Sequence, residues 1–241
     1  MPCVDSPDVT ASPTPLPAAV LWDMDGTLVD TEPYWVAGEH EIVEAAGGTW
    51  NDDYAHQLIG NDLLVSAQFI KDHSPTTLTP QEIIDHLLAR VVEQVREHMP
   101  WRPGAQELLA SLAEAGVPCA LVTMSWRSLA DAVVGALPAG TFAAVITGDE
   151  VSHGKPHPEP YAAATRALNL SVTDCVAIED SPTGVRSAVA AGVPTVAVPH
   201  LIPVPELAGS VQVPTLVGLT AYDLGELAER ARVGSGAPAP R

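Results

Sequence analysis

Two carboxylates, Asp23 and Asp25, stand directly after the apolar run at 18–22. A short apolar run predicts a buried strand, and the end of such a strand is where an open α/β sheet forms its ligand crevice. Two carboxylates this close do not both ionise easily, so one tends to keep its proton. The pair therefore offers a nucleophile or metal ligand beside a general acid. The alternative is an Asp-rich turn in which both side chains only bind backbone amides.

Polar residues also stand at the ends of two later apolar runs. Thr123 follows the run at 117–122, and Glu179 and Asp180 follow the run at 175–178. Carboxylates at such a place suit a hard cation that prefers oxygen ligands. The alternatives are that Thr123 caps the backbone locally and that the two acids cap the helix after them.

Lys155 lies in a loop with glycine and proline on both sides, at 154–158. It is one of only two lysines, the other being Lys71, in a chain with 11 Lys and Arg residues against 30 Asp and Glu. A compact ammonium binds phosphate as a point charge, and an acidic protein needs local positive potential to hold an anionic substrate. Lys155 is therefore a candidate phosphate-binding residue, and a solvated surface lysine is the alternative.

Helices and strands alternate around these residues. Such alternation predicts an α/β fold with a doubly wound parallel sheet and right-handed crossovers. Strands are expected at 18–22, 119–123, 143–147, 176–178 and 195–198, and helices at 105–115, 129–137, 161–168 and 184–191. All the candidate residues then stand at one edge of the sheet.

The stretch at 32–99 has helical patterns instead. A helix is expected from Thr31 to Ala45, and Thr79 with Glu82 forms a capping box before an apolar stripe at helical spacing. The expected division is a tail at 1–17, a core of 18–31 and 100–232, a helical insert at 32–99 and a C-terminal tail at 233–241. The two connectors to the insert are the expected hinges.

The amino-acid composition limits the classes of partner that the chain can bind. Of the 241 residues 46% are hydrophobic, which predicts a folded globule. The formal net charge of -19 argues against nucleic acid or an anionic membrane as a partner. Three cysteines without metal-ligand spacing argue against a disulfide framework. Neither a signal peptide nor a membrane span is apparent, so we expect a cytoplasmic protein. A monomer is only the default expectation.

The segments at 23–28, 117–123, 154–158 and 175–192 resemble, in order, the four motifs of the haloacid dehalogenase (HAD) superfamily. The resemblance spans about 20–198. It implies a Rossmann-like core, with the insert at 32–99 as the small α-helical cap that follows the first motif in some members. The group so indicated contains β-phosphoglucomutases and sugar-phosphate phosphatases.

This resemblance implies roles for the acidic residues. Asp23 is implied as the nucleophile that forms an aspartyl-phosphate, and Asp25 as the acid that protonates the leaving alcohol and then activates water. Mg²⁺ is the implied cofactor. Its implied ligands are the Asp23 and Asp180 carboxylates and the Asp25 backbone carbonyl, while Glu179 would hold a metal-bound water.

The resemblance also implies how the phosphate is held. Thr123 and the backbone amides after it, at Met124 and Ser125, would bind the phosphoryl oxygens. Lys155 would neutralise the phosphate and the nucleophilic aspartate. Together these residues imply a phosphatase acting on a small phosphorylated metabolite.

Substrate identity depends on the cap. The entry at 31–35 resembles hexose-phosphate and hexitol-phosphate phosphatases, so a sugar or polyol phosphate is expected, with Trp35, Asn61, Gln57 and Asp62 as candidates to meet its hydroxyls. Each could instead be ordinary cap packing. A β-phosphoglucomutase-type mutase is the nearer alternative, although the basic cap residues of that group are missing here. A non-catalytic sugar-phosphate-binding protein is the other alternative.

Overall fold

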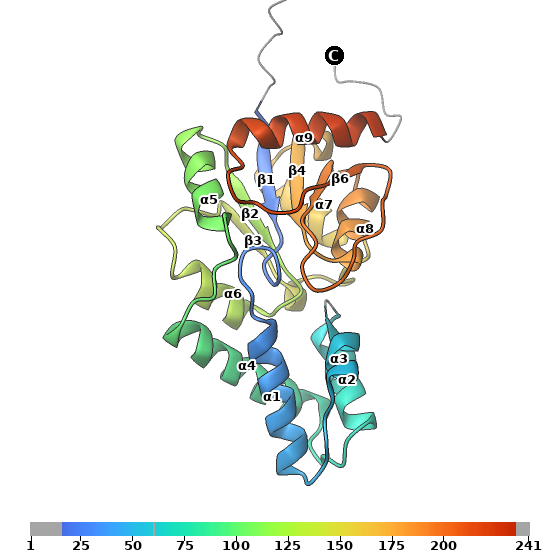
Figure 1. Cartoon of the computed structure of the whole chain (residues 1–241). Helices are drawn as coiled ribbons and strands as arrows, with labels where there is room; N and C mark the ends of the chain where they lie inside the picture. The colour runs from blue at the N-terminus through green and yellow to red at the C-terminus, as the bar shows by residue number, and fades with distance from the viewer. Residues whose placement is uncertain (1–15, 60, 235–241) are drawn as a thin grey trace, which may run out of the picture.

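The computed structural model describes residues 16–59 and 61–234. Within them the strands form one six-stranded parallel sheet in the order β3-β2-β1-β4-β5-β6 (Figure 1). The strands are β1 (Ala19–Trp22), β2 (Cys119–Val122), β3 (Ala144–Ile146), β4 (Cys175–Glu179), β5 (Thr195–Ala197) and β6 (Ser210–Gln212). The predicted doubly wound sheet is confirmed.

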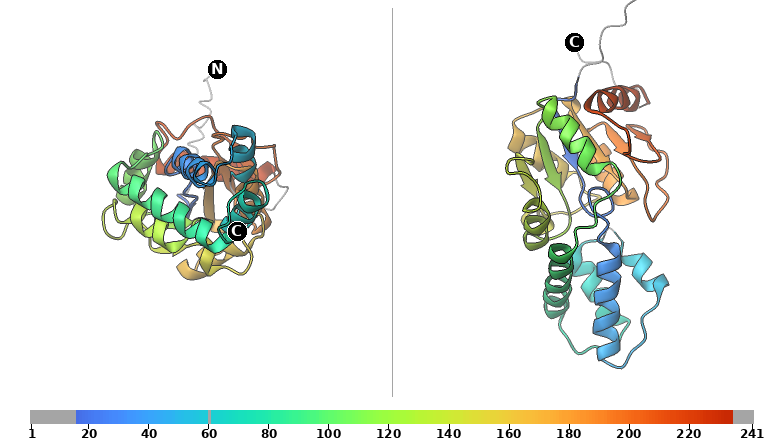
Figure 2. Two further views of the ribbon diagram at one scale, coloured as in Figure 1. Left: turned by 90° about the horizontal axis from the view of Figure 1, so that it is seen from below. Right: turned by 60° about the vertical axis from the view of Figure 1, so that its left-hand side comes forward.

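Helices cover both faces of this sheet (Figure 2). Because successive side chains of a strand point to opposite faces, Val20 and Trp22 of β1 pack in one core cluster, and Ala19 and Leu21 pack in the other. The first cluster includes residues of α5 (Ala105–Glu114), α6 (Arg127–Val134) and α9 (Ala221–Gly234), and the second includes residues of α7 (Glu159–Leu168) and α8 (Pro182–Ala190).

Four helices gather beyond the carboxyl ends of the strands, in the lower part of Figure 1. They are α1 (Glu32–Ala45), α2 (Asp52–Leu58), α3 (Leu63–Asp72) and α4 (Pro80–Glu97). The predicted capping box is present at the start of α4, where the Thr79 amide donates to Glu82 Oε2 at 2.7 Å and the Glu82 amide to Thr79 Oγ1 at 3.3 Å. The apolar stripe of α4 is buried against α1 and α3.

The C-terminal part contains elements that were not predicted. Strand β6 extends the sheet beside β5, and α9 packs on the same edge and reaches Gly234, inside the predicted tail at 233–241. The rest of that tail, at 235–241, and positions 1–15 of the predicted N-terminal tail lie outside the described residues. Within the described ranges, no helix is both long enough and apolar enough to cross a bilayer.

Candidate active site

The predicted site residues meet at the carboxyl edge of the sheet because β1 lies between β2 and β4. Trp22, the last residue of β1, pairs in register with Leu121 and Ile178. The next amide, that of Asp23, donates to the Ile178 carbonyl at 3.0 Å. The chain therefore leaves β1 between the ends of the two neighbouring strands, and three separate loops converge there.

Asp25 is surrounded by hydroxyl groups. Thr123 Oγ1 and Ser125 Oγ donate to Asp25 Oδ2 at 3.1 and 2.8 Å, and Thr31 Oγ1 donates to Oδ1. Burial raises the pKa of Asp25 above its ordinary value, and the nearby Asp23 raises it further, although the three hydroxyl donors oppose this. The balance favours a protonated carboxyl, as a general acid requires.

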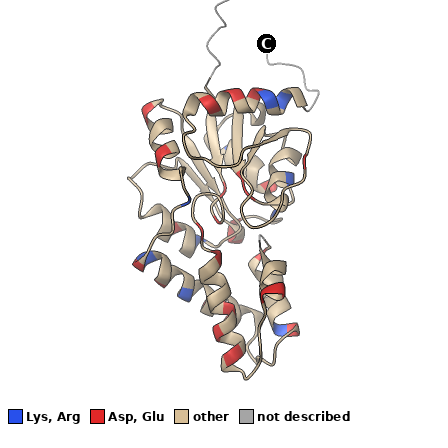
Figure 3. Ribbon diagram, viewed as in Figure 1, with Lys and Arg blue, Asp and Glu red and all other residues tan. Residues whose placement is uncertain are grey.

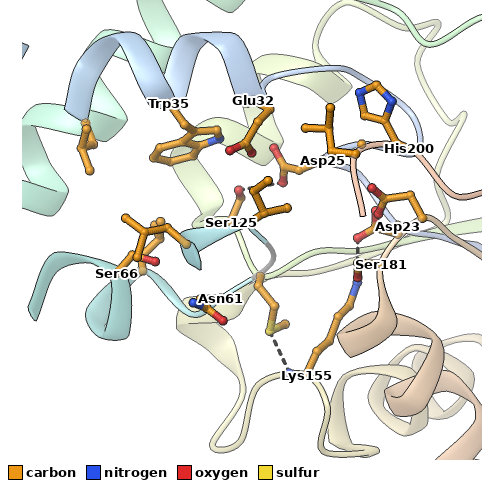
Figure 4. A pocket seen from close by; sticks show the side chains of 18 of the residues that line it. Asp23, Asp25, Glu32, Trp35, Asn61, Ser66, Ser125, Lys155, Ser181 and His200 are labelled. Carbon is orange, nitrogen blue, oxygen red and sulfur yellow. Dashed lines mark hydrogen bonds and ion pairs between the residues drawn. The ribbon is translucent and has the colours of Figure 1, made fainter. Parts of the chain in front are cut away.

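Lys155 extends from its loop into the centre of the site (Figure 4). Its Nζ lies 2.7 Å from Asp23 Oδ1 and 2.6 Å from Glu179 Oε1, and it also donates to the Val122 carbonyl at 2.9 Å. Burial by itself would lower the pKa of Lys155, but the two carboxylates outweigh it and raise the pKa. Lys155 is therefore a fixed cation next to the proposed nucleophile.

Tyr161 was not predicted as part of the site. Its hydroxyl donates to Glu179 Oε1 at 2.6 Å, so the same oxygen receives both Tyr161 and Lys155. The ring lies under the lysine, with Nζ 5.2 Å from its centroid. Because burial and the nearby Glu179 raise the pKa of Tyr161 well above its usual range, the phenol stays a donor. Only its position in the expected helix at 161–168 was apparent from the sequence.

The acidic cluster fits a hard divalent cation. Carboxylate oxygens of Asp23, Glu179 and Asp180 all lie within 4.8 Å of one another. Asp23 Oδ2 is among the described buried oxygens that have no hydrogen-bond partner. A Cβ on Gly26, which has φ of +88°, would come 2.1 Å from Asp180 Oδ2, so only glycine leaves room for this arrangement. Oxygen ligands crowded in this way are the donor set that Mg²⁺ prefers.

The same cluster carries unbalanced negative charge. Burial, with Asp23 and Glu179 beside it, raises the pKa of Asp180 well above its ordinary value, although Lys155 opposes this. Burial also raises the pKa of Glu179 to about 7. One ammonium therefore faces three carboxylates, and a divalent cation would complete the neutralisation.

A pocket opens from this site toward helices α1–α3 (Figure 4). Trp35, Asn61 and Met124, the candidates for substrate contact, are among the residues that line it, and so are residues that were not predicted. The latter include Glu32, Glu39, Ser66, Ser181 and His200. Ser181 directly follows Asp180, and Glu32 directly follows Thr31. Glu39, Ser66 and His200 lie outside the motif segments, where no local pattern marks them.

Two of the four cap candidates are used elsewhere. Asp62 Oδ1 accepts the Leu64 amide at 2.8 Å and caps α3, and the Gln57 side chain donates to the Asp53 carbonyl at 2.9 Å. Neither residue lines the described pocket. Local hydrogen bonds therefore account for these two polar side chains. Asn61 also donates locally, to the Gln57 carbonyl at 2.8 Å, but it lines the pocket as Trp35 does, so both stay candidates for substrate contact.

Comparison with known proteins agrees with this geometry. Residues 20–198 match the family model of haloacid dehalogenase-like hydrolases. The chain is 33% identical over 197 residues to a plasmid CbbY protein of Cupriavidus necator, covering 75% of this chain and 78% of that protein. It is 31% identical over 189 residues to hexitol phosphatase A of Escherichia coli, covering 74% of this chain and 81% of that protein.

Solved structures agree as well. CbbY from Rhodobacter sphaeroides in complex with xylulose-(1,5)-bisphosphate aligns with a TM-score of 0.77 and 27% identity, over 85% of this chain and 96% of that one. The motif order, the parallel sheet and these relatives lead to one identification. The chain belongs to the haloacid dehalogenase-like hydrolase family and is a phosphoric monoester hydrolase.

Proposed function

We propose that the chain is a Mg²⁺-dependent phosphatase that hydrolyses a sugar or polyol phosphate through an aspartyl-phosphate at Asp23. The observation that supports this best is the asymmetric setting of the Asp23 carboxylate. Oδ1 lies 2.7 Å from Lys155 Nζ, whereas Oδ2 has no hydrogen-bond partner among the described residues. The same carboxylate belongs to the acidic cluster with Glu179 and Asp180. Lys155 thus holds the Asp23 carboxylate through Oδ1, and Oδ2 is available for a further contact.

In the first step an Asp23 oxygen forms a bond to phosphorus while the bond from phosphorus to the leaving oxygen breaks. Asp25 donates its proton to that oxygen, and its raised pKa suits this role. In the second step Asp25 takes a proton from water, whose oxygen attacks phosphorus and releases Asp23 and inorganic phosphate. Covalent catalysis in this form divides one slow hydrolysis into two easier displacements.

The other site residues hold the phosphoryl group. Lys155 neutralises its charge, and Thr123 with the backbone amides of Met124 and Ser125 would bind its oxygens. The Thr123 hydroxyl now donates to Asp25 Oδ2 and the Ser125 amide to Thr123 Oγ1, so both donors would turn to the phosphoryl group when it binds. The Asp23 and Asp180 carboxylates and the Asp25 carbonyl would hold Mg²⁺, with Glu179 next to them. Bound Mg²⁺ supplies charge neutralisation at the phosphoryl oxygens, an effect that is usually large in phosphoryl transfer.

Helices α1–α4 would act as the cap that covers the substrate, with residues 32–99 as the moving unit. Trp35 and Asn61 line the pocket on this side and would contact the leaving group. The proposed substrate class follows the hexitol phosphatases among the relatives. The mutase alternative needs a site for a second phosphate, and among the described pocket residues Lys155 is the sole Lys or Arg.

The test is a hydrolysis assay of p-nitrophenyl phosphate with and without Mg²⁺, followed by a panel of sugar, polyol and nucleotide phosphates. We expect Mg²⁺-dependent release of phosphate, with polyol and sugar monophosphates as the best substrates. Glucose 1-phosphate distinguishes the mutase, which would form glucose 6-phosphate instead of inorganic phosphate. Binding of sugar phosphates without any turnover would identify the non-catalytic alternative.

Asp23→Asn tests the nucleophile. The substitution keeps the size of the side chain but removes its charge, so turnover should be lost while the circular dichroism spectrum stays that of the wild type. Substantial Mg²⁺-dependent activity in this variant would show that another group attacks phosphorus. Glu41→Gln, at an exposed position on α1, is the matched control and should keep full activity.

A further inference from the structure

One face of α1 lines the pocket beyond the phosphate site. Glu32, Trp35 and Glu39 all border the pocket, although they are spread over two turns of the helix. Spacings of three and four residues put side chains on one helix face. Within α1 the sequence has no Lys or Arg, and Figure 3 shows Asp and Glu along its ribbon without a basic residue.

On this face of α1, Glu39 is the residue farthest from the reacting centre, and its side chain is held in place. Glu39 is 4% exposed, and its Oε2 accepts a hydrogen bond from Trp50 Nε1 at 2.9 Å. Trp50 is itself held by aromatic contacts, with ring centroids 5.1 Å from Tyr54 and 6.2 Å from Phe69. Glu39 is therefore a rigid, buried acceptor and not a mobile surface carboxylate.

Glu32 stands between Glu39 and the reacting centre. In Figure 4 its carboxyl lies next to that of Asp25. Burial raises the pKa of Glu32 to about 8, and the neighbouring acids Glu39, Asp25 and Asp30 add to this. A carboxyl in such a setting has a strong need for hydrogen-bond partners, whether it is protonated or ionised.

Among the described pocket residues, no Lys or Arg side chain is left to balance the acidic groups on this face of α1. Among the described residues that line the pocket, the sole Lys or Arg is Lys155, which already contacts Asp23 and Glu179. His200 Nε2 faces Asp30 at 3.1 Å. A second phosphate or carboxylate on the substrate would lose its hydration here and face acidic groups without a compensating charge.

We propose that Glu32 and Glu39 form a carboxylate subsite that binds the hydroxyl groups of an uncharged leaving group and excludes substrates with a second anionic group. Hydroxyls can donate to a carboxylate and accept from a carboxyl, so a polyol or sugar chain satisfies both residues. Trp35 adds an apolar face for the carbon chain. This inference rests on the proposed function and narrows its substrate class to monophosphates of neutral polyols and sugars.

The first experiment compares kcat/KM of the wild type for two substrates, the monophosphate and the bisphosphate of the same hexitol. We expect kcat/KM to be at least about 10-fold higher for the monophosphate. A buried charge without a partner costs more free energy than a 10-fold difference in kcat/KM represents. Equal or better use of the bisphosphate would overturn the inference. Failure to hydrolyse either compound or p-nitrophenyl phosphate would instead contradict the proposed function.

The second experiment uses Glu32→Gln and Glu39→Gln. The readout is the ratio of kcat/KM for the hexitol monophosphate to that for p-nitrophenyl phosphate, whose leaving group has no hydroxyl chain. We expect each substitution to lower this ratio by about 10-fold, since one oxygen of each carboxyl is replaced by an amide donor and its hydrogen bond to a substrate hydroxyl is lost. Glu41→Gln, an exposed position on the same helix, should leave the ratio unchanged. Unchanged ratios in both pocket variants would overturn the inference.

A measurement on the wild type covers the case in which a pocket variant does not fold. Competitive inhibition by an unphosphorylated hexitol is compared with inhibition by the hexonate of the same length, which carries a carboxylate, with inorganic phosphate present. The hexitol should inhibit at a concentration at least about 10-fold lower. Equal or stronger inhibition by the hexonate would contradict an acidic subsite.

Discussion

At the scale of single residues, Asp25 shows how burial and hydrogen bonding compete at one carboxyl. Three hydroxyl donors lower the pKa of Asp25, while burial and the Asp23 charge raise it, and the increase dominates. Thr31 belongs to this set although it stands at the N-cap position of α1, because its hydroxyl donates to Asp25. A residue expected only to start a helix therefore also contacts the proposed acid.

Asp25→Asn should slow the enzyme according to the leaving group. Without a proton donor, a sugar or polyol alkoxide leaves poorly, so we expect kcat for such a substrate to fall by about 10²- to 10⁴-fold. The p-nitrophenolate ion leaves without protonation, so formation of the aspartyl-phosphate from p-nitrophenyl phosphate should fall less. Rapid-quench measurement of the first turnover with both substrates checks this. An equal loss for both would contradict the role of Asp25 as the acid.

At the scale of elements, helix starts are well defined by local chemistry. The Thr79 and Glu82 capping box forms as predicted because both hydrogen bonds join residues only three positions apart. Helix α1 differs, since its face toward the pocket is defined by contacts with distant residues such as Trp50. Each of these helices allows a quantitative test.

Thr79→Ala should destabilise the protein by about 1 kcal/mol, within the usual range of about 0.5–2 kcal/mol for loss of an N-cap side chain. Urea unfolding followed by circular dichroism measures this change. Gln81→Ala, in the same first turn of α4, is the control and should change the free energy of unfolding by less than about 0.5 kcal/mol. Equal effects of the two substitutions would show that the cap contributes nothing.

Glu39 should make stability depend on pH. The pKa of Glu39 is raised from 4.5 to about 7, mainly by burial, although the Trp50 hydrogen bond opposes this. Between these values the folded state binds more protons than the unfolded chain, so stability falls as pH rises through this window. At about 1.4 kcal/mol per pKa unit, the loss is about 3 kcal/mol.

Glu39→Gln removes this titration and keeps an oxygen that can accept from Trp50. The free energy of unfolding, measured in urea at about pH 5 and about pH 8 without Mg²⁺, should therefore fall less in the variant than in the wild type. Other buried acids titrate in both proteins. Glu32, whose pKa Glu39 raises, contributes less in the variant, which changes the comparison in the same direction. The same pH dependence in both proteins would contradict a buried, titrating Glu39.

At the scale of the whole molecule, loops from distant parts of the chain meet around one acidic cluster. Asp23 follows β1, and Glu179 ends β4 with Asp180 directly after it. Lys155 comes from the loop before α7. Repulsion among the carboxylates opposes folding of this edge, and a bound cation would relieve it. The metal is thus expected to stabilise the folded chain as well as to serve catalysis.

Mg²⁺ should raise the thermal unfolding midpoint of the wild type. A ligand at 100 times its dissociation constant stabilises the folded state by about 2.7 kcal/mol. Asp180→Asn removes one proposed ligand and one negative charge, so the variant should unfold at a similar or higher temperature without Mg²⁺ and respond little to the ion. Differential scanning calorimetry across Mg²⁺ concentrations measures both effects. A full Mg²⁺ response in the variant would place the metal elsewhere.

The sequence by itself determined five of the six described strands, their parallel arrangement and the edge at which the motif residues meet. Short apolar runs that end in polar residues carry this information locally, because parallel strands bring their carboxyl ends together. Strand β6 was missed because its three residues are only partly buried and are defined by pairing with β5. Helix α9, which contacts β5 and β6, was missed as well.

Only the tertiary structure decided which other residues surround the motifs. Glu39 has no unusual sequence context, and Glu32 was marked only as part of the segment at 31–35. Both line the pocket because α1 packs with one face toward it. Tyr161 likewise reaches Glu179 only because α7 covers the sheet beside the Lys155 loop. Burial and hydrogen bonding between residues far apart in the chain depend on how whole elements pack, and a local pattern of residue types does not contain that packing.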